Sequence, residues 1–526
     1  MQRRHFLGSM TAAAMGASLL RAQPGLAQVQ TQPAAPAAVP APAPVPAPPP
    51  FDFEQVAQIA AELAARDYAK PAATLSGPFK DLGYDAYRGI RFDRAADPWK
   101  DLAGFGLDLL PPGMLYTDPV RINLVEDGAV RPLPFDPSVF IFDDISFPPD
   151  ARQADPGDMG WSGFRLRSRL NRPDFLDELA VFQGASYFRV LARGTRYGLS
   201  ARGLALGTGT PEGEEFPSFR EFWIHTPGPQ EQAIMIHALL DSPSTTGAFQ
   251  FVIRPGSETV MATRVALFPR QELKAAGLAP LTSMFWFGPA DGTGTDDYRR
   301  AVHDSDGLQM VTGTGQRLWR ALNNPATLQI SAFVDENPRG FGLMQRARDF
   351  EDYQDAEAAY ELRPSAWTVP RGPWGKGAVS LVEIPVQNEF HDNIVSFWQP
   401  EAPLAAGQRH DFAYDLVFGL HLGDDAPLAR VRGTRTGKSI NRKGARTYMI
   451  DFDLALFRDQ PDPTAAVTTS AGKVEHPYVV RLPGEDILRL AFEFLPEGAT
   501  MADLSASLNG PAGALSETWL FRWAEG

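Results

Sequence analysis

Short β-type segments separated by turn residues run through most of this chain, and this pattern restricts the folds that it can adopt. Between about residues 105 and 398, apolar runs such as VFIFDDISF, FREFWIHTP and GAFQFVIRPG alternate in part with polar residues and end at Gly, Pro, Asp or Asn. The 526 residues include 47 glycines and 47 prolines, enough for many turns. The pattern predicts an all-β protein built on a large antiparallel sandwich.

A break in the strand pattern predicts a second, smaller domain. The segment Gln399–Pro403, followed by Gly407, interrupts the strands, and several further strand-like runs follow it. We therefore predict an N-terminal β-sandwich over residues 51–398 and a C-terminal immunoglobulin-like sandwich over residues 406–526. One clear amphipathic helix is expected at the start of the folded part, over residues 51–68.

The N-terminal 50 residues have the features of an export signal and a spacer. The pair Arg3-Arg4, a mildly apolar Ala- and Gly-rich run and a small-residue ending at Ala27 predict a twin-arginine (Tat) signal peptide over residues 1–27, and hence a periplasmic protein. Residues 28–50 are rich in Pro and Ala and are expected to form a disordered linker. No later segment is long and apolar enough to be a transmembrane segment of the mature chain.

The charge and the absence of cysteine limit the classes of partner. The formal net charge is −14, and loss of three arginines with residues 1–27 would take it to −17. An acidic surface repels phosphates, so neither nucleic acid nor an anionic membrane surface is expected as a partner. Without cysteine the fold depends on its core and its hydrogen bonds. A neutral substrate fits this composition.

The stretch Ser331–Trp398 is unusually dense in charged and aromatic side chains, and burying so many charges is costly unless they pair or face a wet cleft. Aromatic rings beside carboxylates and guanidinium groups suit a sugar, because its faces are apolar and its rim carries hydroxyl groups. The same residues also fit a surface ion-pair network and a core with buried tryptophans. The sugar interpretation predicts four substrate-binding side chains here: Arg346, Arg363, Trp367 and Trp374.

Two short acidic motifs are candidates for catalysis: His303-Asp304-Ser305-Asp306 and His391-Asp392-Asn393. Aspartate and asparagine commonly cap turns through their side chains, so a purely structural role is open. The His-Asp pairs could also bind a metal ion, although no spacing enforces this. A third alternative is a pair of carboxyl groups for the acid–base cleavage of a glycosidic bond.

The sequence resembles the OpgG/OpgD (MdoG/MdoD) family of periplasmic glucan biosynthesis proteins. Motifs that carry the resemblance include GASYFR at 184–189, YGLSARGLA at 197–205, HDSDGL at 303–308, NPRGFGLMQRARDFEDYQD at 337–355 and DNIVSFW at 392–398. The resemblance extends over nearly all of residues 51–521. The Tat-type signal makes the chain look more like OpgD than OpgG.

The resemblance implies a fold, a substrate and a site. It implies a galactose-mutarotase-like N-terminal sandwich, and β-1,2-linked glucan chains as substrate of an inverting glucanase or transglycosylase. Carried over by motif, Asp392 is the general acid and Asp304 the general base, while Tyr360 and Glu389 support the substrate or a proton relay. No cofactor or metal is implied. The inner-membrane glucan synthase is a conceivable partner, and a homodimer stays open.

General acid–base chemistry sets conditions that the fold must meet. Asp392 should stay protonated in an apolar setting, which Ile394, Phe397 and Trp398 could supply, and Asp304 should stay ionised beside His303 or an arginine. The short connection over residues 438–447 leaves hydrolysis and transglycosylation open. A non-catalytic glucan-binding subunit and a metal-dependent lyase or epimerase are the alternative functions.

Overall fold

The computed structural model describes residues 50–525 apart from 72–74, 103, 292–294, 424–426, 459–460 and 512. The predicted signal peptide and all but the last residue of the predicted linker lie outside the described residues. Strands account for 47% of the structure and helices for 8%, which confirms the all-β prediction. No helix in the described part of the chain is long and apolar enough to cross a membrane.

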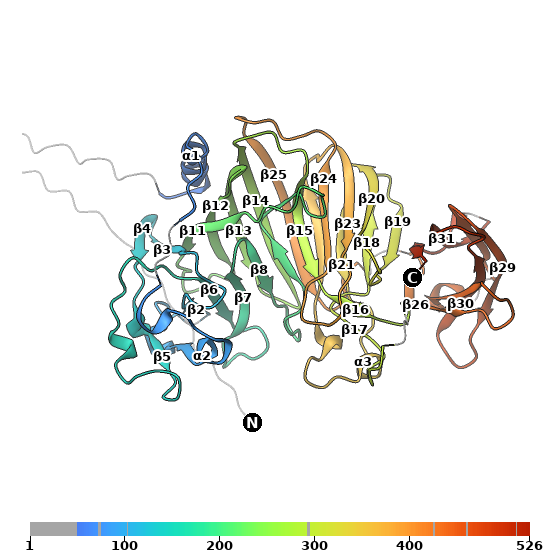
Figure 1. Ribbon diagram of the computed structural model, residues 1–526, viewed down its shortest axis with the longest axis horizontal. Coiled ribbons are helices and arrows are strands. Elements are labelled where there is room, and N and C mark those ends of the chain that lie inside the picture. The colour runs from blue at the N-terminus through green and yellow to red at the C-terminus, as the bar shows by residue number, and fades with distance from the viewer. Residues whose placement is uncertain are drawn as a thin grey trace, which may run out of the picture. The chain divides into compact units, whose positions relative to one another are not determined.

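The first large sheet has ten strands (Figure 1). Their order across the sheet is β2 (Phe105–Leu110), β6 (Gly163–Ser168), β7 (Asp177–Gln183), β8 (Tyr187–Val190), β9 (Ser200–Arg202), β15 (Ala276–Ser283), β24 (Ile394–Pro400), β23 (Lys376–Glu383) and β20 (Gln329–Glu336), with β10 (Ala205–Leu206) beside β15. All of these neighbours pair antiparallel, as the predicted sandwich requires.

The second large sheet has 15 strands. Their order is β28 (Thr464–Thr469), β31 (Met501–Gly510), β33 (Thr518–Ala524), β19 (Arg317–Ala321), β18 (Gly307–Val311), β21 (Gly340–Met344), β22 (Ser365–Arg371), β25 (His410–Gly419), β14 (Glu258–Pro269), β13 (Thr245–Arg254), β12 (Ile234–Asp241), β11 (Ser218–His225), β3 (Arg121–Glu126) and β4 (Ala129–Leu133), with β32 (Gly513–Ala514) beside β31. Parallel pairing occurs at β11–β3 and at β19–β33.

Smaller elements complete the described structure. Two-stranded pairs form between β1 (Ile90–Phe92) and β5 (Phe140–Phe142), and between β16 (Phe285–Phe287) and β17 (Val302–His303). The α-helices are α1 (Phe53–Ala64), α2 (Tyr84–Arg88) and α3 (Phe350–Tyr353).

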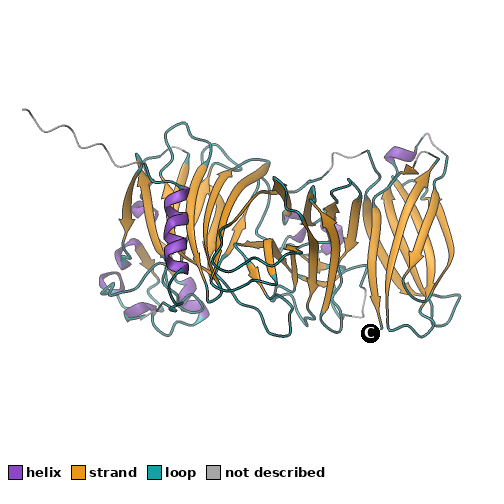
Figure 2. Ribbon diagram, turned by 90° about the horizontal axis from the view of Figure 1, so that it is seen from above, coloured by secondary structure: helices purple, strands orange, loops and turns teal. Residues whose placement is uncertain are grey.

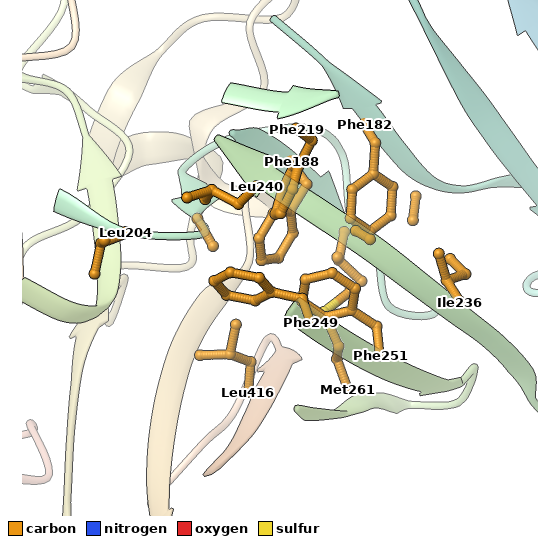
Figure 3. Close-up of a cluster of buried hydrophobic side chains, with 14 of the residues drawn as sticks. Phe182, Phe188, Leu204, Phe219, Ile236, Leu240, Phe249, Phe251, Met261 and Leu416 are labelled. Carbon is orange, nitrogen blue, oxygen red and sulfur yellow. The ribbon is translucent and has the colours of Figure 1, made fainter. Parts of the chain in front are cut away.

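The core between the two large sheets is rich in aromatic side chains (Figure 3). Side chains alternate along each strand, so β13 directs Phe249 and Phe251 inward, where they meet rings from the first sheet. Phe182 of the first sheet lies 5.5 Å from Phe251, centroid to centroid, and Phe188 lies 5.4 Å from it. Burial of these rings is the main force that holds the layers together.

The predicted N-terminal helix is present as α1, drawn in purple against the orange strands in Figure 2. Asp52 caps it, because its side chain accepts a hydrogen bond from the Gln55 N–H while the Gln55 side chain bonds the Asp52 N–H. The buried residues Phe53 and Val56 pack on the outer face of β12, β13 and β14. Both faces of these strands are therefore covered.

The predicted domain boundary at residues 399–405 is wrong. Strand β25 lies beyond it, yet β25 pairs with β14 on one side and β22 on the other, in the second large sheet. The segment rich in Pro and Gly that suggested a boundary carries the chain from β24 in the first sheet to β25 in the second. The chain leaves the large sandwich only after Gly419.

The smaller sandwich begins at β26 and shares a sheet with the larger one. One layer has four strands in the order β26 (Val431–Lys438), β27 (Arg446–Asp453), β30 (Ile487–Leu495) and β29 (Lys473–Arg481). The other layer consists of β28, β31 and β33, and the core between the layers includes Tyr448, Phe492 and Trp519. Because β33 pairs with β19, the second large sheet continues into this layer.

A buried ion pair joins the two sandwiches. Arg346 follows β21 and donates two hydrogen bonds of 2.8 and 2.9 Å to the carboxylate of Glu517, which precedes β33. Arg346 also donates to the Val431 carbonyl oxygen and stacks 3.6 Å from the Trp319 ring centroid. Burial alone would raise the pKa of Glu517. The Arg346 guanidinium outweighs the effect of burial and holds this pKa below its usual range.

Removing one partner of this pair should destabilise the protein strongly. We expect Glu517→Gln to lower the free energy of unfolding by about 3–5 kcal/mol, because it leaves the Arg346 guanidinium buried without a counter-charge. The double variant Arg346→Met with Glu517→Gln should lose less free energy of unfolding than the sum of the losses in the two single variants. Urea denaturation followed by tryptophan fluorescence measures the free energy of unfolding of each variant. Additive losses would show that the pair is not coupled.

Candidate active site

Asp304 lies in the turn between β17 and β18 and is only 4% exposed. Its backbone N–H donates to the Met284 carbonyl oxygen at 2.8 Å, and its carboxylate accepts a hydrogen bond from Arg363. Burial raises the pKa of Asp304, the Arg363 guanidinium lowers it, and the negative charge of Asp392 raises it again. The net direction is upward. Asp304 and Asp392 therefore lie close enough for one charge to affect the other.

Asp392 lies in the loop that joins β23 to β24 and is exposed. It lines a cavity of about 330 Å³ together with residues from the first large sheet, among them Tyr187, Arg189 and Ser200. A neighbouring hollow of about 280 Å³ shares Tyr116 and Tyr187 with this cavity and extends along the same strands. We call the two hollows together the groove.

The end of β15 holds both aspartate loops. The N–H of Asn393 donates to the Ser283 carbonyl oxygen at 3.0 Å, next to the Met284 carbonyl that binds Asp304. The buried Asn393 side chain also accepts from the Phe285 N–H at 2.8 Å and donates to the carbonyls of Phe285 and Ile384 at 2.9 Å. Three consecutive residues, 283–285, thus fix two loops that are distant in sequence.

Tyr360 and Glu389, both predicted as supporting residues, are in direct contact. The Tyr360 hydroxyl donates to Glu389 Oε2 at 2.9 Å, and the Arg363 guanidinium stacks 4.1 Å from the Tyr360 ring centroid. Arg299 donates to the same Glu389 oxygen at 2.6 Å and to Asp355 at 2.9 Å. Burial, and to a smaller degree the charges of Glu389 and Asp304, raise the pKa of Tyr360. This hydroxyl therefore stays protonated at neutral pH.

Three predicted substrate-binding side chains lie elsewhere. Arg346 forms the buried pair with Glu517 described above, so it binds the smaller sandwich. Trp374 is 7% exposed and packs among Trp398 and other core rings. Trp367 packs against the core of the smaller sandwich and covers Gly340, where a Cβ atom would lie 2.4 Å from the indole ring. Only Arg363 of the four predicted residues contacts a candidate catalytic group.

The prediction of an apolar setting for Asp392 is also wrong. Ile394, Phe397 and Trp398 are buried in hydrophobic clusters of the core, while the Asp392 side chain is exposed at the groove. Strand β24 begins at Ile394, so these residues belong to the sheet and not to the loop. The sequence predicted His303 or an arginine beside Asp304, and the arginine is Arg363. His303 instead interacts with Gln345 and lies 3.4 Å from the Asp306 carboxylate.

Sequence reasoning missed several residues around the candidate site. Arg299 links Glu389 to two further carboxylates, but it lies in an ordinary charged loop that gave no distinct signal. Arg202 stacks 4.8 Å from the Tyr187 ring centroid and donates to Glu214 at 2.5 Å. Tyr187 and Arg189 belong to the GASYFR motif that carried the family resemblance, which could have marked them. The described residues contain no cluster of three or more His, Asp or Glu side chains arranged to hold a metal ion.

Comparison with known proteins identifies the family. A family model described as periplasmic glucan biosynthesis protein, MdoG, matches residues 51–523. The chain belongs to the MdoG family. Glucans biosynthesis protein G of Vibrio cholerae serotype O1 is 43% identical over 524 residues, which cover 97% of this chain and 95% of the relative. The protein of that name from Rhodopseudomonas palustris is 44% identical over 478 residues, covering 90% of this chain and 93% of the relative.

Membership of the MdoG family places the chain in periplasmic glucan biosynthesis. A further relative, from Shewanella baltica, is 43% identical over 482 residues and also carries the name glucans biosynthesis protein G. The expected closer likeness to OpgD depended on the export signal at residues 1–27, which lies outside the described residues. The relatives from Vibrio, Rhodopseudomonas and Shewanella carry the name G instead.

Loss of the Asn393 side chain should loosen the support of the site. We expect Asn393→Ala to lower the free energy of unfolding by about 1–3 kcal/mol for each backbone group left unpaired at Phe285 and Ile384. Asn388→Ala in the same loop is the matched control, because its side chain accepts hydrogen bonds only from exposed groups such as the Phe390 N–H. Chemical denaturation should show that the control loses about 1 kcal/mol or less of its free energy of unfolding. Equal losses in both variants would contradict this role of Asn393.

Proposed function

We propose that this protein cleaves or transfers β-1,2-linked glucan chains in the periplasm with inversion at the anomeric carbon. In this proposal Asp392 is the general acid and Asp304 the general base. The observation that carries it is a pair of carboxyl groups whose loops are held by neighbouring carbonyls at the end of β15, one group buried and the other exposed to the groove. Inverting glycosidases require two carboxyl groups in different environments, one to protonate the leaving oxygen and one to activate water.

Exposure to the groove suits Asp392 to the role of the acid. A glucan chain lying in the groove removes water from this side chain, and loss of water favours the neutral, proton-donating form of a carboxyl group.

The ion pair with Arg363 supports Asp304 as the base. The guanidinium favours the carboxylate form that a base needs, against the effect of burial. Because Asp304 is buried, a proton can pass from the groove to its carboxylate only through a water or a hydroxyl group that lies between the two. Tyr360 is the candidate relay, since its hydroxyl is affected by the charge of Asp304 and is oriented by Glu389. Arg299 in turn fixes Glu389.

The groove lining favours a neutral sugar polymer. Tyr116 and Tyr187 offer ring faces for the apolar faces of sugar rings, and Gln183 and Ser200 offer hydrogen-bonding groups. That these sugars are β-1,2-linked glucose follows from the family resemblance. Export through the twin-arginine pathway, as residues 1–27 indicate, is part of the same proposal.

A non-catalytic role in glucan synthesis is the alternative. The relatives are named for glucan biosynthesis, and a subunit that binds glucan beside the inner-membrane synthase would use the same groove. It would bind glucan saturably without changing its size. Turnover therefore separates the two functions.

Replacement of Asp392 should stop the reaction without unfolding the protein. We expect purified protein to change the size distribution of linear β-1,2-glucan, and Asp392→Asn to reduce the rate at least about 100-fold, because a general acid contributes about that much or more. Glu401→Gln, an exposed carboxylate just after β24, is the matched control and should retain the wild-type rate. Product analysis by NMR also gives the anomer formed first. An unchanged glucan size with wild-type protein would refute catalysis.

The pH dependence of the reaction should report the pKa of Asp304. As the pH falls through the pKa of Asp304, the base is protonated and kcat/KM decreases. Burial raises that pKa, so the acidic limb should lie above the value of about 3.9 for a free aspartate. Arg363→Gln removes the cation that lowers the pKa, so the limb should move to still higher pH. Arg371→Gln, from the exposed pair with Asp415, should leave the limb in place. A limb that does not respond to Arg363→Gln would contradict Asp304 as the base.

A further inference from the structure

Three strand ends meet beside the candidate site. Strand β21 lies between β18 and β22 in the second large sheet and pairs antiparallel with both. The start of β18, the end of β21 and the start of β22 therefore lie at one end of the sheet. The turn that carries Asp304 precedes β18, and the turn that carries Tyr360 and Arg363 precedes β22. Gln345, the first residue after β21, lies between these two turns.

The Gln345 side chain makes hydrogen bonds to both turns. Its Nε2 donates to the His303 carbonyl oxygen at 2.9 Å and to the Tyr360 carbonyl oxygen at 3.2 Å. The first of these carbonyls belongs to the peptide bond that joins His303 to Asp304. One amide group thus connects the backbone beside the candidate base to the backbone of the candidate relay.

These contacts fix the orientation of the Gln345 amide. A carbonyl oxygen only accepts hydrogen bonds, so the amide nitrogen must face both carbonyls and the amide oxygen must point the other way. Oε1 lies 3.0 Å from His303 Nδ1, which therefore carries a hydrogen atom and donates it. The Gln345 backbone N–H donates to Ser365 Oγ at 3.0 Å, and the residue is 1% exposed. A buried amide with all of its groups paired holds its neighbours in one arrangement.

The side chains of the two turns also meet. Arg363 donates to the Asp304 carboxylate and stacks 4.1 Å from the Tyr360 ring centroid. Arg348 Nη1 donates to the carbonyl oxygens of Glu361, at 2.9 Å, and of Arg363, and so holds the shape of the turn before β22. Because that turn is held as a unit, its placement against Asp304 depends on the link between the two backbones.

We propose that Gln345 is a positioning residue, which sets the distance and direction between Asp304 and Tyr360. Its effect on the reaction rests on the proposed function, because the relay through Tyr360 belongs to that function. Gln345 is not among the residues that line the groove, so it acts through the two turns and not on the sugar. Catalysis is sensitive to such placement, since a shift of about 1 Å can cost about 100-fold in rate.

The kinetics of a Gln345→Met variant test the proposal. Methionine is close to glutamine in length and lacks the amide, so both backbone links are lost while the core stays filled. We expect kcat on linear β-1,2-glucan to fall at least about tenfold, with KM unchanged because the groove is intact. The acidic limb of kcat/KM should move to higher pH, because a displaced Arg363 lowers the pKa of Asp304 less.

Gln309→Met is the matched control. Gln309 is also a buried glutamine, but its Oε1 accepts from Nη2 of Arg346, the arginine that joins the two sandwiches, at 3.0 Å. Loss of a buried hydrogen bond should destabilise this variant too, while its kcat and pH profile should match those of the wild type. Gln345→Asn keeps the amide on a shorter side chain and should show a smaller fall in kcat. It replaces Gln345→Met in the comparison if that variant does not fold.

A Gln345 variant that is destabilised like the control but keeps the wild-type kcat and pH profile would overturn the proposal. A crystal structure of the same variant gives a readout that needs no turnover, since the Tyr360 hydroxyl should be displaced relative to the Asp304 carboxylate. Unchanged positions of both groups would overturn the proposal as well. Absence of turnover in the wild-type protein would refute the proposed catalytic function, and the crystal structure would then decide the positioning role.

Discussion

The backbone at the end of β15 determines where both candidate catalytic groups lie. Consecutive carbonyl groups of Ser283 and Met284 accept hydrogen bonds from Asn393 and Asp304, which belong to separate loops. This is a consequence of sheet register, because β15 pairs directly with β24, and β24 begins two residues after Asp392. A shift of register by one residue would turn the side chains to the opposite face. The precision of the site therefore depends on the packing of the whole sandwich.

Charge pairing explains part of the dense stretch from Ser331 to Trp398. Arg346 pairs with Glu517, Glu383 with Arg320, and Asp304 with Arg363. Each pair offsets the cost of burying its members, which would be large for a single charge. These pairs lie between strands and between sandwiches, so many of the charges in the stretch stabilise the fold. Asp392 differs from them, since its charge is exposed to the groove.

The sequence predicted the fold class, and it singled out two candidate aspartates without showing which side chains lie beside them. Strand-like runs ending at turn residues identify an all-β chain, because each strand must bury alternate side chains. Trp367 and Trp374 were misassigned because the same ring stacks on a sugar or fills a core, and only burial separates the two. The domain boundary was misplaced because Pro and Gly mark a crossing between two sheets as well as a linker. The role of Arg299 depends on its contacts with the distant Asp355 and Glu389, which a sequence pattern does not contain.

In the proposed function, Asp304 and Asp392 act together on one glucan chain lying in the groove. A crystal structure of the Asp392→Asn variant with a linear β-1,2-glucan bound should then show a sugar chain along Tyr187, with a glycosidic oxygen within hydrogen-bonding distance of residue 392. A water on the opposite face of the sugar should be connected to Asp304. A glucan chain bound away from both aspartates would refute this arrangement.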